Sequence, residues 1–174
     1  MSLQDFTKEE LEEKFNLFIF HIDDNLEEFI DRLQKKGYHL DYSEKSLNIL
    51  EQYIINEKIG WDDDDVNKAG MYFGEYIRKK YNGKWRCSLD DKDNIYYGMP
   101  VIYGHTEPND LELSPIDDVQ TLIVRPRSNH FKTIIEGHID PEEIDWTGFP
   151  DEEEDSSKED PKPDKPRGGW SVFD

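Results

Sequence analysis

The chain has a single cysteine and no long apolar run. Cys87 stands alone among 174 residues, so no disulfide can form within the chain, which is typical of a reducing, cytoplasmic location. No apolar stretch approaches the about 20 residues that span a bilayer. Residues 1–10 also lack the basic and apolar regions of a secretory signal. We therefore expect a cytoplasmic protein without a membrane segment.

The chain is also poor in apolar residues and in cations. Hydrophobic residues make up 34% and charged residues 36%, whereas average globular chains have about 45–50% and about 25%. Only 21 Lys and Arg face 41 Asp and Glu, which gives a formal net charge of −20. This charge disfavours nucleic acid and membrane surfaces as partners and favours a basic protein. Solubility alone needs a net charge of magnitude about 2–8, so the excess indicates recognition of a partner as well.

Apolar residues recur at helical spacing over much of the chain. They predict a long N-terminal helix, in one piece or restarted at Asp23, that opens with the capping box T-x-x-E at Thr7 and ends before Gly37. Its apolar stripe consists of Leu11, Phe15, Phe18, Ile19, Ile22, Leu26, Phe29, Ile30 and Leu33. A second helix is expected from Ser43 to near Gly60. Three more are expected from the run Asp62–Asp65 to Asn82, from Ser114-Pro115 to about Val124, and from Phe131 to Ile139.

Two segments between the third and fourth of these helices resemble strands. Trp85–Leu89 and Ile95–Tyr103 flank a turn-like stretch, Asp90–Asn94, which predicts an antiparallel hairpin. Gly98 and Pro100 interrupt the second segment and predict a bulge or an edge position there.

The predicted fold class is therefore α+β. We expect one domain over residues 5–147, in which N-terminal amphipathic helices pack on a small antiparallel β-sheet. Residues 148–174 are rich in acidic residues and proline, and this composition predicts a disordered acidic tail. The tail ends in an apolar tip, Trp170 to Phe173, that could dock on the domain or on a partner.

The densest motif lies in the third predicted helix, where Gly70 and Gly74 share one face. Glycine costs a helix roughly 1 kcal/mol relative to alanine, so we expect another backbone or a ligand to approach closely there. Glu75 and Arg78 are three residues apart and can pair. We interpret them as a structural ion pair that locks this helix to the hairpin. The alternative is that Glu75 acts as an acid or base in a groove opened by the glycines.

Four motifs carry a resemblance to known proteins. They are A-G-x-Y-x-G-E-x-I-R from Ala69, N-G-K-W from Asn82, G-x-P-V-I from Gly98 and S-P-I-D-D-V from Ser114. Residues 69–124 thereby resemble a loosely defined group of uncharacterised small bacterial α+β proteins, some of them immunity-like. The resemblance implies an α+β fold and an interaction role, and it implies no catalytic residues.

The sequence lacks motifs for metal ions and cofactors, and we expect neither. The run Asp62–Asp65 lacks the third ligand and the glycine of a calcium loop, and Asp90–Asn94 also lacks the glycine. The five histidines show none of the spacings of zinc sites. We interpret His105, at the end of the hairpin, as a surface residue, and Cys87 as a buried small apolar residue.

These observations favour a non-enzymatic acidic binding protein, with an immunity-type inhibitor of a basic protein as its specific form. The expected contacts are an aromatic anchor and two groups of carboxylates: Trp61, Asp62, Asp63, Asp64, Asp65, Asp90, Asp91 and Asp93. Two alternatives stay open. One is a small hydrolytic enzyme that uses Glu75 and His105, and the other is a regulatory protein that acts through the C-terminal tip. The oligomeric state stays open as well.

Overall fold

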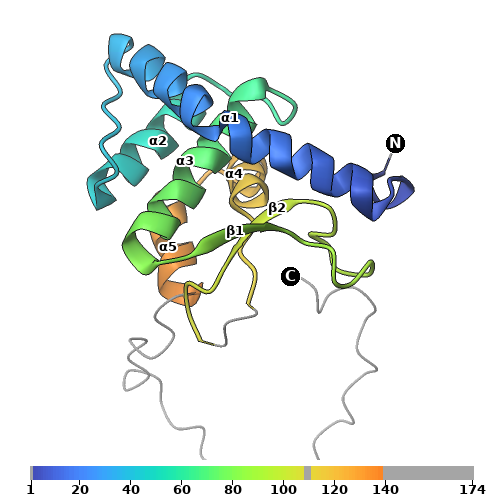
Figure 1. The fold of residues 1–174 in the computed structure, drawn as a ribbon. Coiled ribbons are helices and arrows are strands. Elements are labelled where there is room, and N and C mark those ends of the chain that lie inside the picture. The colour runs from blue at the N-terminus through green and yellow to red at the C-terminus, as the bar shows by residue number, and fades with distance from the viewer. Residues whose placement is uncertain (1, 108–110, 139–174) are drawn as a thin grey trace, which may run out of the picture. The chain divides into compact units, whose positions relative to one another are not determined.

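The structure, a computed structural model, describes residues 2–107 and 111–138 (Figure 1). Within these residues the chain forms five α-helices and one two-stranded antiparallel sheet, so the predicted α+β class is confirmed. The predicted tail, residues 148–174, lies outside the described residues. In chain order the elements are η1 (Leu3–Asp5), α1 (Lys8–Lys35), α2 (Glu44–Asn56), α3 (Asp64–Tyr81), β1 (Lys84–Cys87), β2 (Pro100–Tyr103), α4 (Pro115–Val124) and α5 (His130–His138).

The first helix begins at the predicted capping box. The Thr7 N–H donates to the Glu10 carboxylate over 2.8 Å, and the Thr7 hydroxyl accepts from the Glu10 N–H over 3.2 Å. α1 then runs for 28 residues without a break, because Asp23 lies on its exposed side and does not interrupt the backbone hydrogen bonds. Gly37 follows the helix with φ +93°, a conformation that glycine adopts without steric cost.

The second and third helices also begin and end at polar residues. The Ser43 hydroxyl accepts from the Ser46 N–H and caps α2. α2 ends at Asn56, four residues before the predicted end at Gly60, because Lys58 adopts a left-handed conformation with φ 52° and reverses the chain. Asp63 caps α3, and Asn82 ends it in the left-handed region, as predicted.

The two strands form the predicted antiparallel hairpin, in which Lys84 pairs with Tyr103 and Cys87 pairs with Pro100. The prediction of a strand from Ile95 onward is wrong, because residues 95–99 form turns and β2 starts only at Pro100. The Ser88 N–H donates to the Met99 carbonyl, and the Ser88 carbonyl accepts the Gly98 N–H. Two residues therefore lie opposite one, which is the geometry of the predicted bulge. Gly98 has φ +79°, which favours glycine at this place.

α4 lies where the sequence predicts it, and α5 begins one residue before its predicted start, whereas the predicted end of α5 lies outside the described residues. Ser114 caps α4 by accepting from the Asp117 N–H, and Pro115 occupies its first turn. The start of α5 is capped from another helix, since the Glu51 carboxylate of α2 accepts the Phe131 N–H over 2.9 Å. Burial raises the pKa of Glu51, and the backbone N–H groups around it oppose that rise.

α3 occupies the centre of the described structure and contacts α1, α4 and both strands. Every residue from Ala69 to Ile77 is buried, as expected for a helix with neighbours on all sides. A Cβ atom on Gly70 would lie 2.7 Å from Ile116 Cγ1 and 3.0 Å from Ile116 Cα, and one on Gly74 would overlap the Trp85 ring. The two glycines thus admit the start of α4 and the first strand, which confirms the predicted close approach.

We expect Gly74→Ala to lower the free energy of unfolding by about 1–3 kcal/mol, because the new methyl group must displace the Trp85 ring. Urea unfolding measures this change. Gly137→Ala is the matched control. Gly137 lies on α5, and outside its own helix no described atom lies within 4 Å of the added methyl, so this variant should be as stable as the wild type or slightly more stable. A Gly74→Ala protein of unchanged stability would contradict the close contact.

Candidate functional site

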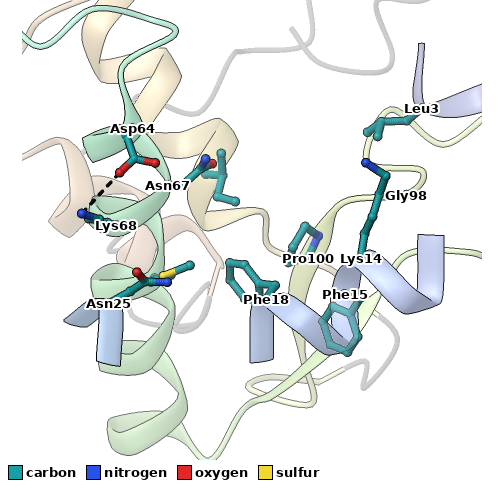
Figure 2. Close-up of a pocket in the computed structure, with 12 residues that line it drawn as sticks. Leu3, Lys14, Phe15, Phe18, Asn25, Asp64, Asn67, Lys68, Gly98 and Pro100 are labelled. Atoms are coloured by element: carbon teal, nitrogen blue, oxygen red, sulfur yellow. Dashed lines mark ion pairs between the residues drawn. The ribbon is translucent and has the colours of Figure 1, made fainter. Parts of the chain in front are cut away.

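A groove of about 510 Å³ opens beside α1, between the start of α3 and the loop that precedes β2 (Figure 2). Its apolar part comes from the aromatic rings of α1 and from aliphatic side chains on α3 and α4: Phe15, Phe18, Met71 and Ile116. Polar groups border it on the α3 side: Asn25, Asp64, Asn67 and Lys68. Leu3, Lys14, Gly98 and Pro100 complete its lining. The lining therefore combines apolar area with amide and charged groups and includes no His, Cys, Ser or Thr.

The predicted acidic run lies at the α3 end of this groove. Trp61 is 53% exposed, and Asp62 and Asp63 are exposed beside it. The Asp63 carboxylate accepts the Asp65 N–H over 3.1 Å and so caps α3. Asp64 lines the groove and pairs with the Lys68 ammonium over 3.3 Å. Three carboxylates and one indole ring are thus open to a partner at this end.

Asp65 is directed inward, and this corrects the prediction that it contacts a partner. It is 9% exposed and accepts hydrogen bonds from Arg32 Nη2 over 2.6 Å, from Arg32 Nη1 over 3.0 Å and from the Tyr53 hydroxyl. Burial raises the pKa of Asp65, but the hydrogen bonds from Arg32 and Tyr53 outweigh it and hold the pKa below its ordinary value. Asp65 therefore joins α3 to α1 and α2 as a buried anion.

The second predicted acidic group lies at the turn between the strands. Its three carboxylates are all exposed: Asp90, Asp91 and Asp93. The Asp91 carboxylate accepts the Asp93 N–H over 2.9 Å, which holds the turn. Gln4 Nε2 donates to the Lys92 carbonyl over 3.2 Å and ties this turn to η1, whose Leu3 lines the groove. Asp90 and Asp91 themselves line a separate, open pocket with Arg86 and Glu112, so this acidic segment lies outside the groove lining.

Glu75 is 4% exposed and forms an ion pair with Arg78, with 2.7 Å between Oε2 and Nη2. Its other oxygen, Oε1, accepts the Trp85 indole N–H over 2.8 Å. Burial raises the pKa of Glu75, but the hydrogen bonds from Arg78 and Trp85 outweigh it, so the pKa lies below its ordinary value. The carboxylate thus connects α3 to β1 and is held in its charged form.

His105 is buried, 6% exposed, and the interpretation of it as a surface residue is wrong. Its Nε2 lies 3.5 Å from Nδ1 of His138 on α5. Burial lowers the pKa of His105 to about 4, and His138 adds to the effect, so the ring is neutral at pH 7. Glu75 bonds to Arg78 and Trp85 rather than to His105, so the structure does not assemble this pair.

Cys87 is half-buried on β1 and is therefore less buried than the sequence predicts. Burial raises the pKa of its thiol to about 11, with the carboxylates of Glu12 and Glu112 adding to the rise. A thiol with this pKa is protonated at neutral pH and is a poor nucleophile.

The sequence does not reveal the groove. Phe15 and Phe18 belong to the predicted core stripe, but they are only half-buried and line the cavity. The opposite wall comes from Asn67 and Met71, about fifty residues further along the chain. No local sequence pattern predicts that these two residues lie close to Phe15 and Phe18. The helical phase gives a partial signal: it places Phe18 at the border of the apolar stripe, but it places Phe15 near the centre.

No protein-family model, curated protein or solved structure matches the chain. The resemblance of residues 69–124 to small bacterial proteins therefore stays a prediction. Over the described residues, the search for a helix long and apolar enough to cross a membrane finds none. In the same residues, no three side chains of His, Cys, Asp or Glu are grouped so that they could hold a metal ion.

We expect Glu75→Gln to lower the free energy of unfolding at pH 7 by about 1–3 kcal/mol, because hydrogen bonds to a buried charge are weakened. The pKa of Glu75 is depressed in the folded state, so its stabilisation is complete above the ordinary pKa of 4.5 and is lost as the pH falls through the folded-state value. The difference in free energy of unfolding between wild type and variant should therefore become smaller below pH 4.5. Urea unfolding between pH 7 and 3 measures this difference. A difference that is independent of pH would contradict the role of Glu75 as a stabilising buried carboxylate.

We expect Asp65→Asn to lower the free energy of unfolding by about 3 kcal/mol, because Arg32 and Tyr53 lose their buried anion. Asp62→Asn makes the same chemical change three residues earlier at an exposed position and should shift stability by less than about 0.5 kcal/mol. Thermal and urea unfolding of both variants compare the two. An equal loss of stability in the two variants would show that the contacts of Asp65 with Arg32 and Tyr53 do not stabilise the fold.

Proposed function

We propose that this protein is a non-enzymatic binding protein that recognises a basic protein. One observation carries the proposal: an apolar groove whose lining includes Asp64, with Asp62 and Asp63 exposed directly before it in the chain (Figure 2). A basic chain segment that lies in the groove can bury apolar side chains against Phe15 and Phe18. Its cations then meet Asp64 in the groove lining and the exposed Asp62 two residues before it.

The charge of the described residues supports this proposal. They hold 27 acidic and 17 basic side chains, so the acidic excess extends to the folded region and is not confined to the predicted tail. Carboxylates that face a cationic partner accelerate association and select among partners, while the apolar centre supplies affinity. Trp61, exposed at the α3 end, is of the residue type that most often carries binding energy.

Two lysines line the groove and oppose a basic partner to different extents. The Lys68 ammonium is paired with Glu28 over 2.9 Å and with Asp64 over 3.3 Å, so its charge is compensated. Lys14 lies over the Phe6 ring, 4.5 Å from its centroid, and forms no ion pair in the described part of the chain. Lys14 is therefore the cation that weakens the proposed interaction.

An immunity-type inhibitor is the specific form that fits this chemistry, because nucleases and other toxins that act on nucleic acid are basic. In such a complex the acidic surface would compete with the phosphate backbone for the cations of the partner. The contacts proposed for this role are Trp61, Asp62, Asp63, Asp64, Asp90, Asp91 and Asp93.

The proposal predicts that a lysine-rich peptide of about ten residues with a central leucine binds in the groove. Stopped-flow association should slow steeply between low and physiological ionic strength, because the exposed carboxylates become screened. Asp62→Asn with Asp64→Asn should slow association roughly three- to tenfold at low ionic strength. Lys14→Gln should accelerate it, because the opposing cation is gone.

The matched control removes two carboxylates elsewhere, with Glu107→Gln and Glu136→Gln, both exposed and absent from the groove lining. This pair should change association much less than the pair at the groove. An equal effect of the two pairs would show that net charge alone attracts the peptide. Absence of binding, or association that does not respond to salt, would refute the proposed function.

A further inference from the structure

The outer side of α1 carries two large apolar side chains that no described residue covers. Phe20 is 77% exposed, the highest value among the large apolar side chains described, and Leu17 is 54% exposed. They are three residues apart on one helix and are therefore neighbours on its surface. The His21 ring contacts the edge of the Phe20 ring, with 4.9 Å between centroids. In Figure 1 this helix is the long blue one at the edge of the fold.

Acidic residues extend this apolar pair in both directions along α1. At 3.6 residues per turn, five exposed acidic residues share the face of Phe20: Glu9, Glu13, Asp24, Glu27 and Asp31. None of these five forms an ion pair within the described residues. Together with Leu17 and Phe20 they form what we call the outer stripe, which is about 33 Å long at 1.5 Å per residue.

The surroundings distinguish the outer stripe from other exposed apolar residues. Val124, at the end of α4, is 61% exposed, but Arg125 follows it and no carboxylate adjoins it in the sequence. Isolated exposed apolar residues are common on protein surfaces and need no partner. An aromatic ring at the centre of a run of unpaired carboxylates has the composition of a binding site with an apolar anchor and a polar rim.

We infer that the outer stripe binds a basic amphipathic helix of a partner protein. Helices of this kind dock their apolar residues at intervals of three and four, which matches the spacing of Leu17 and Phe20. Lysine or arginine residues on both flanks of the partner helix would then meet Glu13 on one side of the apolar pair and Asp24 and Glu27 on the other. That the partner is basic rests on the proposed function. That it is helical, and that it binds on the outer side of α1, is inferred from the outer stripe.

A second copy of this chain fits the stripe poorly. Two outer stripes that pack antiparallel about Phe20 would bring Glu13 of each copy opposite Glu27 of the other, and Glu9 opposite Asp31. Like charges in direct contact oppose association, so the stripe favours a cationic partner over itself.

The outer stripe is distinct from the groove, although α1 contributes to both. Phe15 and Phe18, which line the groove, lie on the face of α1 opposite to Phe20. A partner on one face therefore does not occlude the other. Substitutions on each face can accordingly be tested separately.

The test uses the full chain and a synthetic helical peptide of about 18 residues with leucine at intervals of three and four and lysine elsewhere. A scrambled peptide of the same composition controls for charge. Fluorescence anisotropy of the labelled peptides measures affinity at physiological ionic strength. We expect the helical peptide to bind more tightly than the scrambled one, and Phe20→Ser to weaken it at least about tenfold without changing the net charge.

Val124→Ser is the matched control, because Val124 is an exposed apolar residue without acidic neighbours in the sequence, and it should leave affinity within about twofold. Circular dichroism tests whether both variants fold, which is expected because both side chains are exposed.

If Phe20→Ser and Leu17→Ser bind the peptide like the wild type while Asp62→Asn with Asp64→Asn weakens binding, the proposal for the outer stripe is refuted and the proposal for the groove stands. If neither peptide binds, the proposed function fails with it. A protein that dimerises in sedimentation, and loses the dimer with Phe20→Ser, would show that the occupant is a second copy.

Discussion

The close contact of α3 with the segments that follow it is the constraint on which the rest of the structure depends. Gly70 and Gly74 leave no Cβ on one face, so Ile116 brings the start of α4 against α3 and the Trp85 ring covers the next turn. The indole N–H of Trp85 then reaches Glu75 on the same helix. The hairpin and α4 are thereby fixed beside α3, and with them the inner wall of the groove.

The acidic residues have two physically different uses, although the sequence does not separate them by type. Asp65 and Glu75 are buried, each beside an arginine that compensates the cost of removing a carboxylate from water. The carboxylates of the outer stripe and of Asp62 are exposed and remain solvated. Only the exposed ones can exchange water for a partner at low cost, so the recognition proposed here draws on a fraction of the total charge.

The sequence predicts local features of this fold well and long-range ones poorly. The caps at Thr7, Ser43 and Ser114 were predictable because a cap is decided within about four residues. Among the four consecutive aspartates, nothing local singles out Asp65, since its burial depends on Arg32, which precedes it by 33 residues. The burial of His105 depends in the same way on α5. Helical phase, by contrast, already separates Phe18 from Phe20.

The cap that Glu51 provides for α5 has a consequence for the folding of α5. The described part of α5 has nine residues, and a helix of that length is not stable alone in water. Its first turn is completed by a carboxylate 80 residues earlier in the chain. The formation of α5 is therefore coupled to the packing of α2, although the two helices are far apart in the sequence.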